Sequence, residues 1–411
     1  MNSQEGKFKK GKRRIRMKRR VIACVLYACC VATILCANGN KEQSAKSSVA
    51  EGADWAQEVG LNLEETPEEL YEKAKKEGEV NVYGCTGRIE TVKKDFEAAY
   101  PGITLNFYDL GINEMLEKFG REHAAGIYTA DVLQLKEQTG SIKREYIDQN
   151  LLYNYQPKDI FGNVNPDYLA VTPFVIELDW WSYNTDLYKD LPISSWWDVT
   201  KPEWKGKFVM LDPSGEPDLP VLFACMVKHA DEMAADYQKV FGKPIELGPD
   251  EPNAGYAWIN RVAKNNPILE TSNSNIVKDV GGAPDMKAAP IGYGVSSKLR
   301  ERDIQGFRLG VNPQKFDMPT TAVSFMIAQI ADHAPHPNAA KLFVRFLCGE
   351  KDHNGKGIQP FLTAGSYPVF PDSKNTSKMP SYESIPKFEV DFDYWYEHFQ
   401  DVSDYWVSAQ P

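Results

Sequence analysis

A helix with both ends marked in the sequence opens the region that most constrains the fold, residues 66–108. Thr66 is a suitable N-cap, Pro67 suits the first helical position, and Glu69 completes a capping box. The helix stops at Gly78, because glycine readily adopts the left-handed conformation that ends many helices. The sequence therefore predicts a short amphipathic helix with well-defined ends.

The residues after this helix alternate between strand and helix patterns. Glu79–Tyr83 is a short apolar strand, and the loop Gly84–Gly87 opens a second helix at about Ile89–Tyr100. Pro101–Gly102 ends that helix, and Ile103–Tyr108 is a second strand. This order of helix, strand, loop, helix and strand predicts an α/β fold with mostly parallel sheets.

Three segments of this region resemble the beginning of mature extracellular solute-binding proteins of ABC importers. They are Ala74–Gly78, Val80–Tyr83 and Phe96–Ile103, in the same order and register as in that family. The resemblance is to the group whose members bind ferric iron, polyamines, thiamine or sugar phosphates.

Further segments extend the resemblance over about residues 66–370. Tyr183–Leu187 is similar to the family's hinge segment, and Ser194–Phe208 matches the most specific segment of its second lobe. Thr320–Gln329 is similar to the strand that returns through the hinge, and Ala334–Leu347 is similar to a helix with proline in its first turn. The aromatic and acidic C-terminal residues resemble no segment of the family.

The resemblance implies an α/β fold of the type II periplasmic-binding-protein class, or Venus flytrap, with a hinge between two lobes. Lobe 1 is expected to comprise 55–178 and 320–365, and lobe 2 to comprise 179–319 and 366–411. The ligand would lie between the lobes, at loops past the C-terminal ends of strands. Closure by hinge bending is the expected motion.

The N-terminal residues are expected to serve export. Residues 1–36 combine ten Lys or Arg with the apolar run Val21–Cys36, which is shorter than a typical membrane span, and so predict a signal or anchor segment. Residues 37–54 form a polar tether. Cys36 is the expected lipidation site and Cys29 is the alternative; a signal that is simply cleaved, or retained as an anchor, stays open. We expect an exported protein at the cell surface or in the periplasm of a bacterium.

The net charge limits the classes of binding partner, and the cysteine count limits the disulfide bonds that the chain can form. Beyond residue 36 the chain carries 37 basic and 56 acidic residues, a net charge near −19, which argues against nucleic acid and anionic membranes. Three cysteines remain there, and an odd number in an exported chain is no disulfide framework. Cys225 and Cys348 are expected to be buried in apolar helices, whereas Cys85 lies in the loop after the first strand.

Three loops that follow predicted strands are candidates for the ligand site, because helix N-termini there present backbone N–H groups to anions. They are Gly84–Arg88, Asp212–Glu216 and Gly292–Ser296. The acidic residues of the second loop disfavour an anion at that point. In the family, a further loop faces the cleft after a strand that matches Ala130–Leu135.

Eight residues are expected to bind the ligand, namely Thr86, Arg88, Glu137, Trp180, Trp181, Ser214, Glu216 and Tyr293. Glu137 and Glu216 would pair with a cation, and Arg88 would pair with an anion. Trp180 and Trp181 would stack on a cation or a sugar ring. Adjacent strand residues face opposite sides, so at most one of these two tryptophans would line the cleft.

The sequence gives no sign of catalysis or of a cofactor. Iron-binding relatives use an adjacent pair of tyrosines, which this chain lacks, so that Tyr293 stands alone near the matching place. The six histidines are scattered without ligand spacing. We therefore expect no metal in the site, with a ferric receptor of the same family as the alternative. There is no P-loop, nucleophile elbow or H-E-x-x-H motif.

The function these features favour is that of a monomeric receptor, not an enzyme. It would capture a small polar solute (a polyamine or other organic cation, a sugar or a sugar phosphate) and deliver it to the membrane permease of an ABC importer. A sensory binding module and an enzyme remain alternatives on the same scaffold, because a fold does not determine function.

Overall fold

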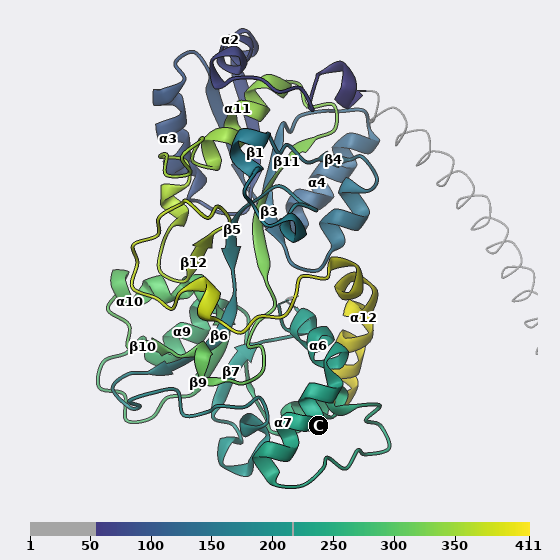
Figure 1. Cartoon of the computed structure of the whole chain (residues 1–411), viewed down its shortest axis with the longest axis vertical. Helices are drawn as coiled ribbons and strands as arrows, with labels where there is room; N and C mark the ends of the chain where they lie inside the picture. The colour runs from purple at the N-terminus through teal and green to yellow at the C-terminus, as the bar shows by residue number, and fades with distance from the viewer. Residues whose placement is uncertain (1–54, 216–217) are drawn as a thin grey trace, which may run out of the picture. The chain divides into compact units, whose positions relative to one another are not determined.

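The computed structural model describes residues 55–215 and 218–411 (Figure 1). Ala56–Pro411 forms one compact unit. The expected signal segment, the tether, both candidate lipidation cysteines and Glu216 lie outside the described residues. Of the helices in the described part, none is long and apolar enough to cross a membrane.

Helix α2 (Pro67–Glu77) forms as its capping residues predict. The Thr66 hydroxyl accepts a hydrogen bond from the Glu69 amide, and the Glu69 carboxylate accepts one from the Thr66 amide. Gly78 follows with a φ of 80°, a left-handed conformation that suits glycine. The buried face of α2 packs on α11 (Pro337–Leu347).

The larger sheet has the strand order β12-β5-β11-β3-β1-β2, with β4 paired to β11. Strand β1 is parallel to β2 and β3, and the other pairs are antiparallel. With α2 and α11, the elements of this lobe are β1 (Glu79–Gly84), α3 (Ile89–Ala99), β2 (Thr104–Asp109), α4 (Ile112–Ala124), β3 (Val132–Glu137), η1 (Ile142–Ile147), β4 (Leu152–Tyr153), α5 (Lys158–Phe161), η2 (Pro166–Tyr168), β5 (Pro173–Glu177), β11 (Ser324–Ala331), η7 (Gln359–Phe361) and β12 (Ser366–Pro368).

The smaller sheet has the order β10-β6-β9-β7-β8. Strand β7 is parallel to β8 and β9, whereas β6 is antiparallel to β9 and β10. The elements around it are β6 (Asp179–Asn184), η3 (Asp198–Thr200), η4 (Pro202–Trp204), β7 (Phe208–Leu211), α6 (Asp218–Lys228), α7 (Ala230–Phe241), α8 (Ala254–Lys264), β8 (Ile268–Glu270), α9 (Asn273–Gly281), β9 (Ile291–Val295), η5 (Ser296–Arg300), α10 (Glu301–Ile304), β10 (Leu309–Val311), η6 (Pro313–Lys315), η8 (Tyr382–Ser384) and α12 (Phe392–Ala409).

Both sheets are mixed, so the expectation of mostly parallel sheets is wrong. The chain leaves the larger sheet through β5, enters the smaller one through β6, and returns from β10 to β11. A strand that runs toward the crossing and a strand that runs away from it have opposite directions, so β11 is antiparallel to both β3 and β5.

The strand ends of the two sheets meet where the chain crosses. Glu177, the last residue of β5, is paired with Ser324, the first residue of β11. Two residues later, Asp179 begins β6 and is paired with Val295, the last residue of β9. The C-terminal ends of β1, β3, β7 and β9 therefore point to this junction, which is the place where open α/β sheets bind ligands.

The C-terminal residues contribute a strand to one lobe and a helix to the other. Strand β12 pairs with β5 in the larger sheet, so Ser366–Pro368 goes with that sheet although 366–411 is expected in lobe 2. Helix α12 packs on α6 and α8 of the other lobe. Figure 1 shows it in yellow at the right, beside α6. The division into lobes at the other expected boundaries stays a proposal.

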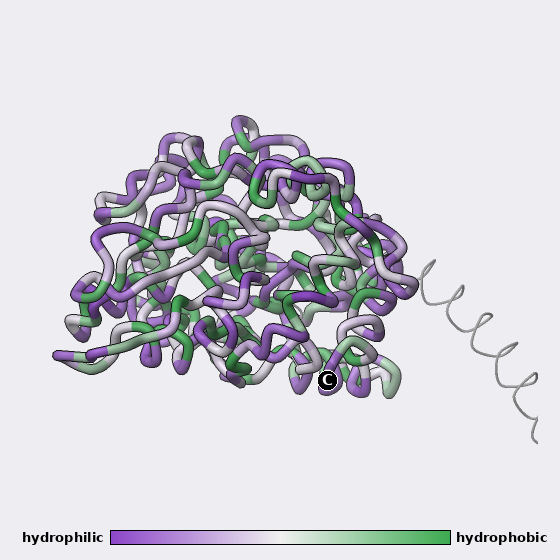
Figure 2. The backbone as a smooth tube through the Cα atoms, turned by 90° about the horizontal axis from the view of Figure 1, so that it is seen from below, coloured by the Kyte–Doolittle hydropathy of each residue, from purple (hydrophilic) through white to green (hydrophobic). Residues whose placement is uncertain are grey.

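Apolar side chains fill the interior of each lobe. Figure 2 shows hydrophobic stretches in green running through the inside, with hydrophilic turns outside. Cys225 and Cys348 are buried on α6 and at the end of α11, which confirms the prediction for both thiols. The smaller-sheet lobe has an aromatic core in which Trp196 and Trp258 are fully buried.

Candidate functional site

A buried ion pair links the two lobes at the junction. Lys136 lies near the end of β3, and its Nζ is 2.7 Å from Oδ1 of Asp218, the first residue of α6. The side chains are 15% and 8% exposed. A carboxylate at a helix N-terminus is stabilised by the helix dipole, and Lys136 supplies the opposite charge. The pair therefore ties the position of α6 to that of β3.

Two further carboxylates, Glu177 and Asp179, flank this pair at the β5–β6 crossing. Asp179 is 6% exposed, and its Oδ1 has no hydrogen-bond partner among the described residues. Burial and the charge of Asp218 raise the pKa of the Asp179 carboxyl to about 8, although Lys136 acts in the opposite direction. Burial thus favours the protonated form of this carboxyl, and that form offers one O–H donor and one acceptor at the junction.

We expect Asp179→Asn to raise the free energy of unfolding at about pH 8 and to change it much less at about pH 5. The ordinary pKa of aspartate is about 3.9, so raising it to about 8 in the folded protein makes stability fall as the pH rises between these values. Asparagine cannot ionise and should flatten this fall. Urea denaturation across the pH range measures the slope, with Asp303→Asn, at an exposed carboxylate, as the control. Equal slopes for wild type and Asp179→Asn would contradict the assignment.

Two cationic side chains, Arg88 and Lys298, lie near Glu177. A third, Arg300, lies near both of them and pairs with Glu301 at 3.6 Å between Nε and Oε1. Arg88 follows β1, and Lys298 and Arg300 belong to η5 after β9. Burial and the charge of Arg300 lower the pKa of Arg88, and the same two causes lower the pKa of Lys298. The attraction of Glu177 acts against this on both side chains. The cations thus repel one another, and an anion between them would relieve that repulsion.

The Arg88 side chain is oriented by an aromatic ring and not by an ion pair with a described residue. Its guanidinium lies over the ring of Phe361, with 5.4 Å between Cζ and the ring centroid, a contact that fixes its orientation. It is half-buried and makes no ion pair with another residue in the described part of the chain. The Thr86 hydroxyl accepts a long hydrogen bond of 3.4 Å from the Arg88 amide, so both expected residues of this loop lie together.

Ser296 holds η5 against the opposite lobe. Its hydroxyl donates to the Gly365 carbonyl and accepts from the Leu178 amide at 3.0 Å. A Cβ on Gly365 would lie 1.8 Å from the Ser296 carbonyl oxygen, and Gly365 has a φ of 87°. Only glycine fits this approach, which positions Lys298 and Arg300 beside the crossing.

Glu137 has a structural role at the end of β3. Its carboxylate accepts hydrogen bonds from the amides of Thr139, Gly140 and Lys143 at 2.9 to 3.0 Å. The side chain is buried, so these three donors hold the turn that leads into η1. We therefore leave Glu137 out of the proposed ligand site.

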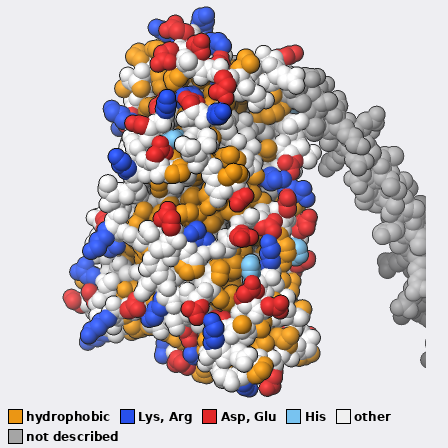
Figure 3. Space-filling view, in the orientation of Figure 1, with side chains coloured by type: hydrophobic (Ala, Val, Ile, Leu, Met, Phe, Trp, Pro, Cys, Tyr) orange, Lys and Arg blue, Asp and Glu red, His pale blue; other side chains and the backbone are white. Residues whose placement is uncertain are grey.

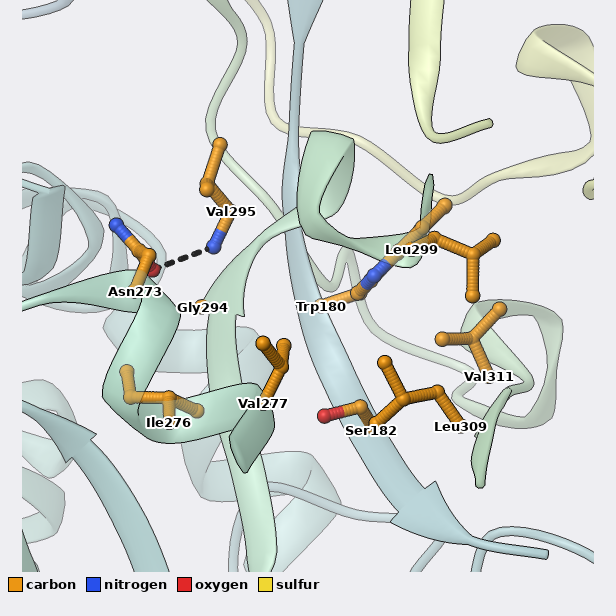
Figure 4. Close-up of a pocket in the computed structure, with 10 residues that line it drawn as sticks. All are labelled: Trp180, Ser182, Asn273, Ile276, Val277, Gly294, Val295, Leu299, Leu309 and Val311. Atoms are coloured by element: carbon orange, nitrogen blue, oxygen red, sulfur yellow. Dashed lines mark hydrogen bonds between the residues drawn. The ribbon is translucent and has the colours of Figure 1, made fainter. Parts of the chain in front are cut away.

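The two adjacent tryptophans of β6 face opposite sides. Trp181 packs with Trp196 and Tyr293 in the aromatic core, and the Tyr293 hydroxyl donates to the Thr320 carbonyl at 3.0 Å. Trp180 points to the other face, into a small pocket beneath α9 (Figure 4). The pocket is lined by Trp180, Ser182, Asn273, Ile276, Val277, Gly294, Val295, Leu299, Leu309 and Val311.

Ser214 is exposed in the loop after β7, where its amide donates to the Asp212 carboxylate at 2.9 Å. Of the expected residues, Thr86 and Arg88 lie at the junction. Trp180 lines the small pocket, to which η5 contributes Leu299, and Trp181 and Tyr293 lie in the aromatic core.

Figure 3 shows hydrophobic side chains gathered across the middle of one face, between the lobes.

The charged residues that complete the junction had little signal in the sequence. Lys136 stands in the loop that the resemblance places at the cleft, but Asp179, Asp218, Lys298 and Arg300 belong to no recognisable motif. They come together only because strands from two sheets end at the same place.

No family model matches this sequence, and neither does any curated protein. Solved structures do match its fold. Iron-bound HitA from Pseudomonas aeruginosa aligns with a TM-score of 0.60 at 16% identity, over 80% of this chain and 99% of HitA. Ferric iron-binding protein A from Mannheimia haemolytica, in an open conformation, gives 0.58 at 19% identity, over 81% and 98%. AfuA from Actinobacillus pleuropneumoniae with fructose-6-phosphate bound gives 0.59 at 16% identity, over 80% and 98%. The chain therefore has the two-lobed fold of periplasmic binding proteins, as expected.

Proposed function

We propose that this protein is the solute-binding component of an ABC importer, and that it binds its solute between the lobes at the junction. The observation that carries the proposal is the set of charged side chains that both lobes contribute there, with Arg88 from one lobe and Lys298 and Arg300 from the other. A receptor of this kind needs no catalytic group. It captures the solute, closes, and delivers it to a membrane permease.

Among the solutes expected from the sequence, the site favours a sugar phosphate. The phosphate would lie between the three cations, where charge-assisted hydrogen bonds are strong. The Asp179 carboxyl, whose protonated form is favoured by burial and whose Oδ1 has no partner among the described residues, would bind sugar hydroxyls, which both donate and accept. AfuA, with a similar fold, binds fructose-6-phosphate.

The same residues disfavour the other two classes. For a polyamine, Glu137 is already occupied by backbone amides and Asp218 by Lys136. Of the other two junction carboxylates, Asp179 favours its protonated form, which leaves Glu177 to pair with a cation. For ferric iron, which HitA binds, the tyrosine expected near the site is buried and hydrogen-bonded to the Thr320 carbonyl. Hard Fe(III) requires anionic oxygen ligands, and burial raises the pKa of the Tyr293 phenol.

A thermal-shift screen of the full-length chain is the test of ligand class. We expect one or more sugar phosphates to stabilise the protein, by about 2.7 kcal/mol at 100 times the dissociation constant, and polyamines and ferric citrate to have little effect. Free sugars and inorganic phosphate are the matched controls. Stabilisation by ferric citrate or a polyamine alone would overturn the choice of ligand.

The alternatives of enzyme and sensor have their own tests. Release of inorganic phosphate from a stabilising sugar phosphate would reveal an enzyme. A neighbouring gene for a histidine kinase, in place of one for a permease, would favour the sensory module. We further propose export to the cell surface or periplasm, lipid anchoring through Cys36, and a monomeric receptor, and metabolic labelling with a fatty acid tests the anchor.

A further inference from the structure

Two histidines and an aspartate meet on the lobe of the larger sheet, away from the proposed ligand site. His123 Nε2 and His333 Nδ1 each lie 2.8 Å from the same atom, Asp332 Oδ2. One ligand atom from each of the three residues lies within 4.8 Å of the others. Both rings are thus directed at one carboxylate oxygen.

The cluster lies at the far end of β11 from the junction. Strand β11 begins at Ser324, beside Glu177, and Asp332 and His333 follow its last residue. Eight residues of strand span roughly 26 Å. His123 comes from the last turn of α4, so the cluster joins two elements that are distant in the sequence. The spacing of the histidines could not reveal it.

The surroundings fix both rings. The Tyr128 ring stacks on His333, with 4.6 Å between the centroids, and meets His123 edge-on at 5.6 Å. Asp332 is buried, while the two histidines are partly exposed, so an ion could reach the cluster from solvent. Burial and the charge of Asp332 raise the pKa of Tyr153, which places that phenol beside the same carboxylate.

We propose that His123, Asp332 and His333 form a binding site for a divalent transition-metal ion of the zinc class. Two imidazole nitrogens and a carboxylate oxygen are ligands that Zn²⁺ favours, with a water molecule as the fourth ligand. A tetrahedral ion separates its ligand atoms by about 3.3 Å, and each nitrogen already lies 2.8 Å from Asp332 Oδ2, with all three ligand atoms within 4.8 Å of one another, so side-chain adjustment alone would complete the geometry. This site is separate from the solute site and does not depend on the proposed function.

Calorimetric titration of the metal-free full-length chain with zinc chloride tests the site. Wild type should take up one ion that the double variant His123→Gln/His333→Asn does not bind, a loss of at least about 100-fold in affinity, because even residues that only support a ligand contribute 10- to 100-fold. Asparagine suits the left-handed backbone of His333, whose φ is 54°, and glutamine can still hydrogen-bond to Asp332. His229→Gln is the control, since His229 also contacts a carboxylate but has no second histidine. Any zinc that the cysteines of the N-terminal residues bind is the same in every variant, so it does not affect the comparison.

X-ray absorption at the zinc edge of the wild-type complex gives a second measurement that requires no variant. Two imidazole nitrogens with oxygen ligands would agree with the site. A shell of sulfur alone, equal zinc affinity in wild type and the double variant, or no zinc binding by wild type would overturn it.

Discussion

Replacing Arg88 with glutamine should weaken binding of the sugar phosphate by about 10- to 100-fold. Arg88 lies over Phe361 and forms no ion pair with any described residue, and Glu177 attracts it only from beyond ion-pair distance, so a bound phosphate would be its first close anionic partner. Hydrogen bonds to a charged group contribute about 1.5–3 kcal/mol, and about 1.4 kcal/mol corresponds to tenfold in affinity. Glutamine keeps polar contact but removes the charge. Calorimetric titration of the two proteins with the same ligand measures the difference.

Arg302→Gln is the matched control for that experiment. Arg302 pairs with its neighbour Asp303 and with the Lys378 carbonyl, outside the junction. It should bind the ligand as tightly as wild type. If Arg88→Gln also binds as tightly as wild type, the anion does not lie between the three cations, and the proposed placement of the phosphate is wrong.

Replacing Trp196 with alanine should lower the free energy of unfolding by about 3–5 kcal/mol, the usual cost of removing a buried aromatic side chain. Trp196 has no exposed surface and packs against Trp258, Tyr293 and Phe316 at centroid distances of 5.4 to 5.7 Å. Its indole N–H donates to the Pro319 carbonyl at 2.9 Å, on the segment that returns to the larger sheet. Alanine would leave both a cavity and an unpaired carbonyl. Denaturation in guanidinium chloride measures the loss.

Trp204→Ala is the control within the same sequence segment. Trp204 is only partly buried in η4, so its removal should cost markedly less than that of Trp196. Equal losses for the two variants would show that Trp196 is not the centre of this core.

Local structure could be predicted where short-range chemistry decides it. Thr66, Glu69 and Gly78 fix the ends of α2 within a few residues of sequence, and the strand, loop and helix that follow form where the pattern places them. Turn and cap chemistry of this kind does not depend on distant residues. The same holds for the buried thiols of Cys225 and Cys348, whose apolar neighbours are adjacent in the sequence.

The site could be predicted only in part, because its geometry depends on contacts between the lobes. Arg88 was identifiable from its loop, but its partners Lys298 and Arg300 lie more than 200 residues away in the sequence. Glu137 looked like a free carboxylate after a strand, yet three backbone amides of the next turn occupy it. Every residue except proline carries a backbone N–H, so the sequence does not mark which amides will occupy this carboxylate.

The directions of the strands and the docking of the C-terminal helix also depend on contacts between distant parts of the chain, which local sequence does not reveal. Alternating helices and strands favour parallel pairing, but a chain that crosses twice between sheets must place outgoing and returning strands side by side. The acidic, aromatic C-terminus forms α12. Its Trp406 packs against Phe223 of α6, and its Tyr405 packs against Tyr256 of α8, both in lobe 2. No local pattern indicated where this helix would dock.

Amide hydrogen exchange of the full-length chain, with and without the sugar phosphate that stabilises it most, tests the central claim directly. A solute bound between the lobes contacts loops of both, so exchange should slow in Cys85–Arg88 and in Ser296–Arg300 together, as well as at the crossing around Leu178. Protection in the loops of one lobe alone, or no protection in these three segments, would contradict a solute site at the junction.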